Sequence, residues 1–249
     1  MRFRDALRKL LVLAMWLMPF GYAVGAELTS VGSMRFDVYY GTQGLKVGEA
    51  RHDWRIGPDS YELNLNLEAK GLASLFGLQY EQHSSGTVGS AGLRPDVFVV
   101  DQRRRKRESA HFDWPAARVS LRRDGKERRS GTISSGDQDV LSLWHQVRRF
   151  ARSEQPVALN VVTGKSIKRA SVRVLGRELL KLPLGEVETL RMQAQAEGGE
   201  LDIDIWLSLQ HDLLPVRIRI ADDEGSVLDQ RATMIDPERK PGSITTEKN

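Results

Sequence analysis

The sequence of 249 residues contains no cysteine. Disulfides, cysteine-ligated zinc, iron–sulfur clusters and thiol catalysis are therefore excluded. The glycine-x-serine-x-glycine motif, which presents a nucleophilic serine in many hydrolases, is also missing. The five histidines show no metal-ligand spacing: His52, His83, His111, His145 and His211. We accordingly expect no enzymatic activity, no catalytic residue, no cofactor and no bound metal.

The first 26 residues have the order of a secretory signal peptide. Four basic residues within positions 2–9 precede an apolar stretch over residues 10–20, and small residues follow up to Ala26. This stretch is shorter than the ~20 apolar residues that a membrane-spanning helix needs. We predict cleavage after Ala26, with Ala23 as the second choice, and a periplasmic location for the exported chain.

The positive charge of the chain is small once the signal is set aside. The formal net charge is +4, and residues 1–26 hold four basic and one acidic side chain, so the remainder carries +4 − 3 = +1. Residues 101–154 hold 14 basic and 8 acidic side chains, or +6, which leaves −5 elsewhere. Aromatic residues suited to base stacking do not accompany this basic region. We therefore expect no nucleic-acid partner.

Alternation of apolar and polar residues dominates the exported chain. In residues 61–68, tyrosine or leucine alternates with glutamate or asparagine, which predicts a strand with one buried and one solvated face. Residues 45–56 are the expected hairpin partner across the turn at 57–60, and residues 36–40 belong to the preceding strand.

A second hairpin is predicted near the C-terminus, from residues 201–207 and 216–220. If Asp204 faces Arg217, opposite charges meet on one face and aliphatic side chains meet on the other. Trp206 then lies on the charged face and needs a cover, which a loop, the helix or another protein can supply. We take Trp206 as a candidate contact for an envelope-protein partner.

One amphipathic helix is predicted from Asp139 to Arg152. Its apolar stripe consists of Val140, Leu141, Trp144, Val147, Phe150 and Ala151. Asp139 suits the N-cap position, because its carboxylate can accept from the free amides near Ser142. We expect this stripe to cover the concave or end face of a curved sheet.

These elements predict an all-β fold with one packed α-helix: a curved antiparallel β-meander of about ten or more strands that forms a barrel or half-barrel. We expect a single β-rich domain over residues 27–236, a disordered tail over residues 237–249, and a monomer.

Two segments are candidate contacts for a lipid or for an anionic membrane surface. The first is apolar: Leu72, Leu75, Phe76 and Leu78. It is either a lid over a lipophilic cavity or a turn that closes the end of the core. The second is basic: Arg103, Arg104, Arg105, Lys106 and Arg107. It is either a contact for phosphate-bearing lipids or a solvated edge strand whose charges discourage pairing with another sheet.

Two further features have a structural interpretation. Gly164-Lys165-Ser166 resembles the end of a phosphate-binding loop, but Leu159 stands where that loop requires glycine, so we interpret the segment as a hairpin turn. The tryptophans at 54, 114 and 144 are core residues or, alternatively, line a ligand cavity.

Several short motifs together resemble one family. They are Gly44 to Gly48 with Ala50, Gly71-Leu72-Ala73, Gly92-Leu93-Arg94-Pro95, Asp139-Val140-Leu141-Ser142, and Trp206-Leu207 followed by Leu214-Pro215-Val216. In order and spacing the chain is similar, over about residues 34–236, to the bacterial exported family catalogued as domain of unknown function 3108. The resemblance implies an exported β-rich domain of bacteria with an outer membrane, and it implies no activity, substrate or catalytic residue.

Two functions are consistent with these features. Curled meanders commonly enclose an apolar cavity, which favours a non-enzymatic binder of a lipid or lipophilic ligand in envelope maintenance. The alternative is a structural or scaffolding module that binds other envelope proteins through a strand edge or Trp206. An interior filled by side chains would count against the first function.

Overall fold

We describe the protein from a computed structural model, in which residues 30–71, 79–199, 201–222 and 225–237 are described. The predicted signal peptide, the apolar segment with Leu72, Leu75, Phe76 and Leu78, and the tail after Pro237 lie outside these residues. None of the helices in the described part is long and apolar enough to span a membrane.

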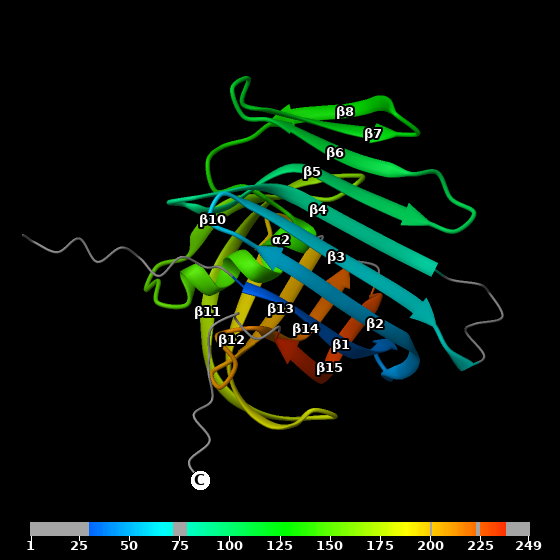
Figure 1. Ribbon diagram of the computed structural model, residues 1–249, viewed down its shortest axis with the longest axis vertical. Helices are drawn as coiled ribbons and strands as arrows, with labels where there is room; N and C mark the ends of the chain where they lie inside the picture. The colour runs from blue at the N-terminus through cyan, green and yellow to red at the C-terminus, as the bar shows by residue number, and fades with distance from the viewer. Residues whose placement is uncertain (1–29, 72–78, 200, 223–224, 238–249) are drawn as a thin grey trace, which may run out of the picture.

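A single antiparallel sheet of 15 strands forms almost the whole fold (Figure 1). The strands are β1 (Ser30–Tyr40), β2 (Leu45–Ile56), β3 (Ser60–Ala69), β4 (Gln79–Gly89), β5 (Gly92–Gln102), β6 (Glu108–Asp113), β7 (Arg118–Arg123), β8 (Lys126–Thr132), β9 (Gln138–Asp139), β10 (Val157–Val162), β11 (Ile167–Leu182), β12 (Gly185–Ala196), β13 (Leu201–Ser208), β14 (Pro215–Asp222) and β15 (Val227–Pro237). Their order is β8 to β1, then β15 to β9, so two meanders join where β1 pairs with β15. Among the described strands, β9 and β10 form the one parallel pair.

The alternation of apolar and polar residues along the strands determines which face of the sheet is buried. In β3, Tyr61, Leu63, Leu65 and Leu67 are buried while the residues between them point outward. The predicted hairpin partner is confirmed, because β2 pairs with β3 from Gly48–Ala69 to Ile56–Tyr61. The sheet curls around this apolar face, and its end strands β8 and β9 do not pair with each other among the described residues, so the half-barrel form of the prediction is the observed one.

The predicted register of the C-terminal hairpin is wrong by two residues. Asp204 pairs with Arg219, and Arg217 lies opposite Trp206. A shift of two residues leaves every side chain on its predicted face, so the alternation cannot detect it. A β-bulge between Trp206 and Leu207 sets the observed register, and it lets the Arg217 guanidinium lie 4.5 Å from the centroid of the Trp206 ring.

The helix is shorter and more deeply buried than predicted. Helix α2 (Val140–Gln146) continues as the 3₁₀ helix η2 (Val147–Phe150), and all seven residues of α2 are buried. It lies inside the curl and packs on β3, β4, β5 and β10 (Figure 1). The Asp139 cap is confirmed, since its carboxylate accepts from the amides of Leu141 and Ser142 at 2.9 and 2.8 Å. The centre of the curl is therefore filled by the helix.

Glycines allow the two ends of the sheet to approach each other. A Cβ atom on Gly131 in β8 would lie 2.7 Å from Ile167 Cδ1 in β11, and one on Gly164 would lie 2.8 Å from Glu108 Cβ in β6. The Gly164 contact is too close for a side chain, because Glu108 Cβ is fixed by the backbone, whereas the Cδ1 end of Ile167 can shift. The turn between β10 and β11 therefore packs against β6. We call this line of contact the seam; none of the described strands pair across it.

Candidate functional site

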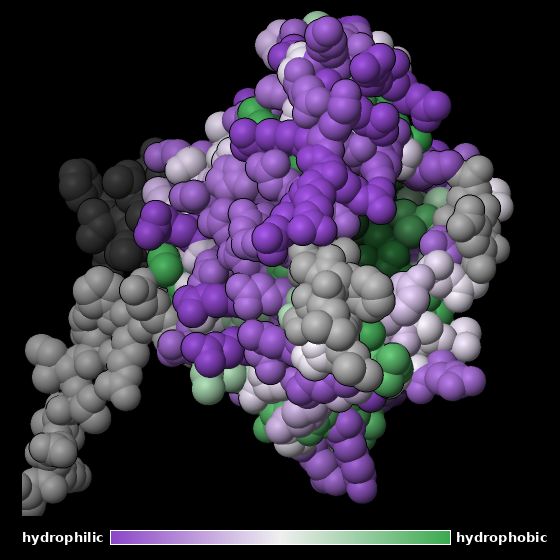
Figure 2. Space-filling view, turned by 90° about the vertical axis from the view of Figure 1, so that its right-hand side faces the viewer, coloured by the Kyte–Doolittle hydropathy of each residue, from purple (hydrophilic) through white to green (hydrophobic). Residues whose placement is uncertain are grey.

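An open cleft of about 430 Å³ lies beside this seam. Its walls come from β4, β5, β6, β7, the first residue of α2, the β10–β11 turn, and one residue each of β13 and β14. Figure 2 faces the side of the molecule on which the right-hand strand ends of Figure 1 lie, and it shows hydrophobic surface recessed between hydrophilic surfaces. The volume falls within the range of small-molecule sites.

The deeper wall of the cleft is apolar. It is formed by Phe98 and Val100 of β5, Val140 of α2, Leu201 of β13 and Ile220 of β14. Phe98 is fully buried, and Val140 retains 7% exposure. These side chains come from four elements that are distant in sequence, and they converge because the curled sheet brings β13 and β14 opposite β5. The wall offers a ligand dispersion contacts and removal from water, without charged groups.

One polar pair interrupts the apolar wall. Gln82 Nε2 donates to Tyr80 Oη at 2.6 Å, and both residues line the cleft. Gln82 Oε1 is buried and has no hydrogen-bond partner among the described residues. Burial also raises the pKa of Tyr80, so its hydroxyl stays protonated at neutral pH. This pair can form hydrogen bonds with a hydroxyl or carbonyl group of a ligand.

The mouth of the cleft is cationic. Glu108 forms ion pairs with Arg123 at 3.2 Å and with Lys165 at 3.8 Å. Arg105 and Lys106 also line the cleft, and Lys106 lies 3.5 Å from Asp124. The cleft thus combines an apolar wall with a positively charged mouth.

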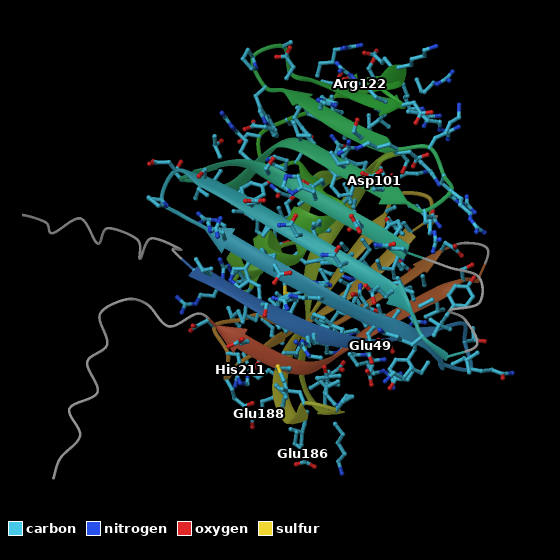
Figure 3. The ribbon with its side chains drawn as sticks, turned by 45° about the vertical axis from the view of Figure 1, so that its right-hand side comes forward. Glu49, Asp101, Arg122, Glu186, Glu188 and His211 are labelled. Atoms are coloured by element: carbon cyan, nitrogen blue, oxygen red, sulfur yellow. The ribbon has the colours of Figure 1, made fainter. Side chains whose placement is uncertain are left out.

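The predicted basic segment is a turn rather than an edge strand. Residues 103–107 connect β5 to β6, and β8 is the strand at that end of the sheet. Of the five basic residues, Arg105 and Lys106 line the cleft, whereas Arg103 and Arg104 do not. Arg107 pairs with Asp101 at 3.2 Å. Figure 3 places Asp101 at the end of β5 and Arg122 on β7, and β6 lies between these two strands in the sheet.

Trp206 is covered within the chain. The indole is 3% exposed, with the Arg191 guanidinium 5.0 Å and the Arg217 guanidinium 4.5 Å from its ring centroid. Its Nε1 donates to Glu178 Oε2 at 2.8 Å. Two arginines and a glutamate therefore supply the cover that its position on the outer face requires.

Two of the other predicted core aromatics, Trp144 of α2 and Trp54 of β2, pack against buried histidines. Trp54 and Trp144 are buried, Trp114 is partly buried, and none of the three lines the cleft. The His52 ring stacks on Trp144 with 4.8 Å between centroids, and its Nε2 lies 3.0 Å from Gln230 Oε1. Burial lowers the pKa of His52 to about 4 and that of His145 to about 3, so both imidazoles are neutral. This cluster is packed core around α2. No metal-binding group of three or more histidine or acidic residues occurs in the part of the chain that the structure describes.

Sequence reasoning missed the residues that complete the mouth. Arg123 ends β7, where the local sequence marks no site, and Lys165 lies in the β10–β11 turn, which the sequence predicts only as a hairpin turn. Glu108, which joins them, follows the basic turn directly. Glu108 and Arg123 are partners in the pairing of β6 with β7, and the approach of Gly164 to Glu108 across the seam adds Lys165.

The fold and cleft define an open, curled β-sheet protein with an internal helix and one apolar recess beside its seam. Residues 35–233 match the family described as "Protein of unknown function (DUF3108)", so the chain belongs to this family, as its motifs predicted. A comparison with curated proteins finds no match.

Two solved structures are similar to the chain. The first is a β-barrel-like protein of domain of unknown function DUF1849 from Brucella abortus, with 9% identity and a TM-score of 0.56 over 85% of this chain and 99% of that one. This likeness supports the β-barrel-like fold. The second is described as a "putative lipoprotein" from Parabacteroides distasonis, with 9% identity and a TM-score of 0.28 over 83% and 95% of the two chains.

Proposed function

We propose that the protein is a non-enzymatic binder of a lipid or other lipophilic molecule, which occupies the cleft beside the seam. The observation that carries this proposal is the apolar recess formed by Phe98, Val100, Val140, Leu201 and Ile220. The helix fills the centre of the curl, so the proposal places the ligand at the side of the fold.

The hydrophobic effect provides the free energy for binding a lipophilic molecule in this cleft. Each methylene of a ligand that leaves water contributes about 0.8 kcal/mol. Association itself costs roughly 4 kcal/mol or more, so about six buried methylenes are needed before binding becomes favourable. A molecule with an alkyl chain meets this condition, whereas a small polar metabolite does not.

Native mass spectrometry and lipid extraction of the purified protein test the proposal. We expect a bound lipophilic species in the wild type and its loss in Val100→Glu, which places a carboxylate in the apolar wall. Val99→Glu is the matched control, since Val99 is the preceding residue of β5 and does not line the cleft. Protein that carries no lipid and takes up none when it is offered would refute the proposal.

We also propose that the protein acts in the periplasm after cleavage of residues 1–26. The basic, apolar and small-residue order of that segment supports export. Mass spectrometry of the N-terminus is the test: the expected terminus is Glu27, and an intact Met1 in the envelope fraction would contradict it.

A scaffolding role is the second candidate, and strand β8 favours it. β8 ends the sheet, all but one of its seven residues are exposed, and none of the described strands pairs with its outer edge. Such an edge can accept a strand of another protein, although its lysine and arginines oppose indiscriminate pairing. Crosslinking in cells distinguishes the two functions, because a scaffold yields a stable protein partner and a binder yields lipid.

A further inference from the structure

We infer that the ligand of the cleft is an amphiphile with an anionic head group, which the cationic mouth holds while the alkyl chain lies on the apolar wall. This inference rests on the proposed function and specifies its ligand class. It follows from the arrangement of charge around the cleft.

Positive charge at the mouth is only partly neutralised by the protein. Four basic residues line the cleft, namely Arg105, Lys106, Arg123 and Lys165, against one carboxylate, Glu108. Glu108 serves both Arg123 and Lys165. Asp124, outside the cleft, pairs with Lys106, and Arg105 has no ion pair among the described residues. Four positive charges against these two negative ones leave an excess of two at the mouth, which an anion from outside can neutralise.

The depth of each group gives the ligand its orientation. The side chains of Arg123 and Lys165 are 47% and 63% exposed, so their charged ends reach solvent at the mouth. Phe98 and Val140 lie in the buried wall. A charged head group keeps contact with water and with the cations in this orientation, because its transfer to the apolar wall would be costly.

Carboxylate and phosphate share the chemistry that this mouth recognises. A guanidinium such as that of Arg105 or Arg123 can donate two hydrogen bonds to either group. A fatty acid and a monoacyl phospholipid are the two sources of such an amphiphile, and one binding experiment can separate them.

The experiment compares three ligands with the same alkyl chain: oleate, 1-oleoyl-lysophosphatidate and the neutral 1-oleoylglycerol. We expect the full exported chain to bind at least one anion about tenfold more tightly than the neutral ligand at low salt, from two partly exposed charge contacts. This difference should shrink as the salt concentration rises.

Two sets of variants locate the effect. The double variant R105Q/K106Q should reduce the preference for the anions to about twofold or less. The matched control R103Q/R104Q removes the same charge from the same turn, outside the cleft, and should keep most of the preference. Glu108→Gln removes the carboxylate that competes for Arg123 and Lys165, so it should tighten anion binding severalfold. Misfolding would increase the binding of 1-oleoylglycerol as well, so a gain confined to the anions reports the change of charge.

The outcomes distinguish the claim of an anionic head group from the proposed function of lipid binding. Preference for lysophosphatidate supports the inference and assigns a phospholipid source, and preference for oleate supports it and assigns a fatty acid. Equal binding of all three ligands overturns the anionic head group and leaves the proposed function standing. Equal losses in both double variants overturn the assignment to the cleft mouth, because diffuse attraction would then explain the preference. Failure of all three ligands to bind refutes the proposed function itself.

Discussion

Protonation of the buried histidines should make the fold sensitive to mild acid. His52 and His145 are 3% and 5% exposed and lie next to Trp144 and Trp54 around the helix. Loss of hydration lowers the pKa of His52 from 6.5 to about 4, and that of His145 from 6.5 to about 3. The positive charge of Arg148 adds to the lowering at His145.

The folded and unfolded states bind different numbers of protons, and this difference determines whether stability rises or falls with pH. Below pH 6.5 the unfolded chain protonates both histidines while the folded protein does not, so the free energy of unfolding falls as pH falls towards 4. Between pH 7 and pH 5 each histidine lowers the free energy of unfolding by about 2 kcal/mol. Asp139 acts in the opposite direction, because burial raises its pKa from 3.8 to about 6, and its protonation in the folded state offsets about 1 kcal/mol. The expected net loss is about 2 to 3 kcal/mol.

Urea unfolding at pH 7 and pH 5 measures this loss. His52→Gln should reduce the difference between the two pH values by about 2 kcal/mol, because glutamine does not titrate. His83→Gln, at a partly exposed histidine of β4 that bonds Asn64, is the control for the substitution itself. An equal pH dependence in the wild type and His52→Gln would refute the reasoning.

Three substitutions test the packing, each by urea unfolding against the wild type. Gly164→Val should cost about 1 to 3 kcal/mol, because its Cβ atom would lie 2.8 Å from Glu108 Cβ, and an unchanged stability would show that the seam is loosely packed. Asp139→Ala removes the acceptor of two helix amides and should cost about 1 to 2 kcal/mol, whereas Asp139→Asn should cost less. Trp206→Ala should cost about 3 to 5 kcal/mol, and a loss below 1 kcal/mol would contradict the burial of the indole.

The sequence predicts those parts of the fold that depend on local pattern. Alternation in residues 61–68 identifies β3 and its buried face, and the carboxylate of Asp139 identifies the start of the helix. The complete burial of α2 is not predictable in this way. Ser142 and Gln146 lie outside the apolar stripe, yet Ser142 Oγ donates to Asp139 O and Gln146 Oε1 accepts from the Leu93 amide, so both are accommodated inside the curl.

The cleft is beyond local pattern because strands distant in sequence form it. Arg105 and Lys106 could be identified as a basic segment, but the sequence could not separate them from Arg103 and Arg104 in the same turn. Lys165 reaches the mouth because the β10–β11 turn packs on β6, a contact that depends on the curl of the whole sheet.

Crosslinking with a photoactivatable fatty acid tests the central claim most directly, because it reports where a lipophilic chain lies on the protein. A diazirine near the middle of the alkyl chain, followed by peptide mapping, should label Phe98 or Val100 of β5 and the cleft-lining parts of β13 and β14 near Leu201 and Ile220. Excess unlabelled oleate should suppress this labelling. Adducts spread over the outer face of the sheet, or adducts at the cleft that oleate does not suppress, would contradict a lipid-binding cleft.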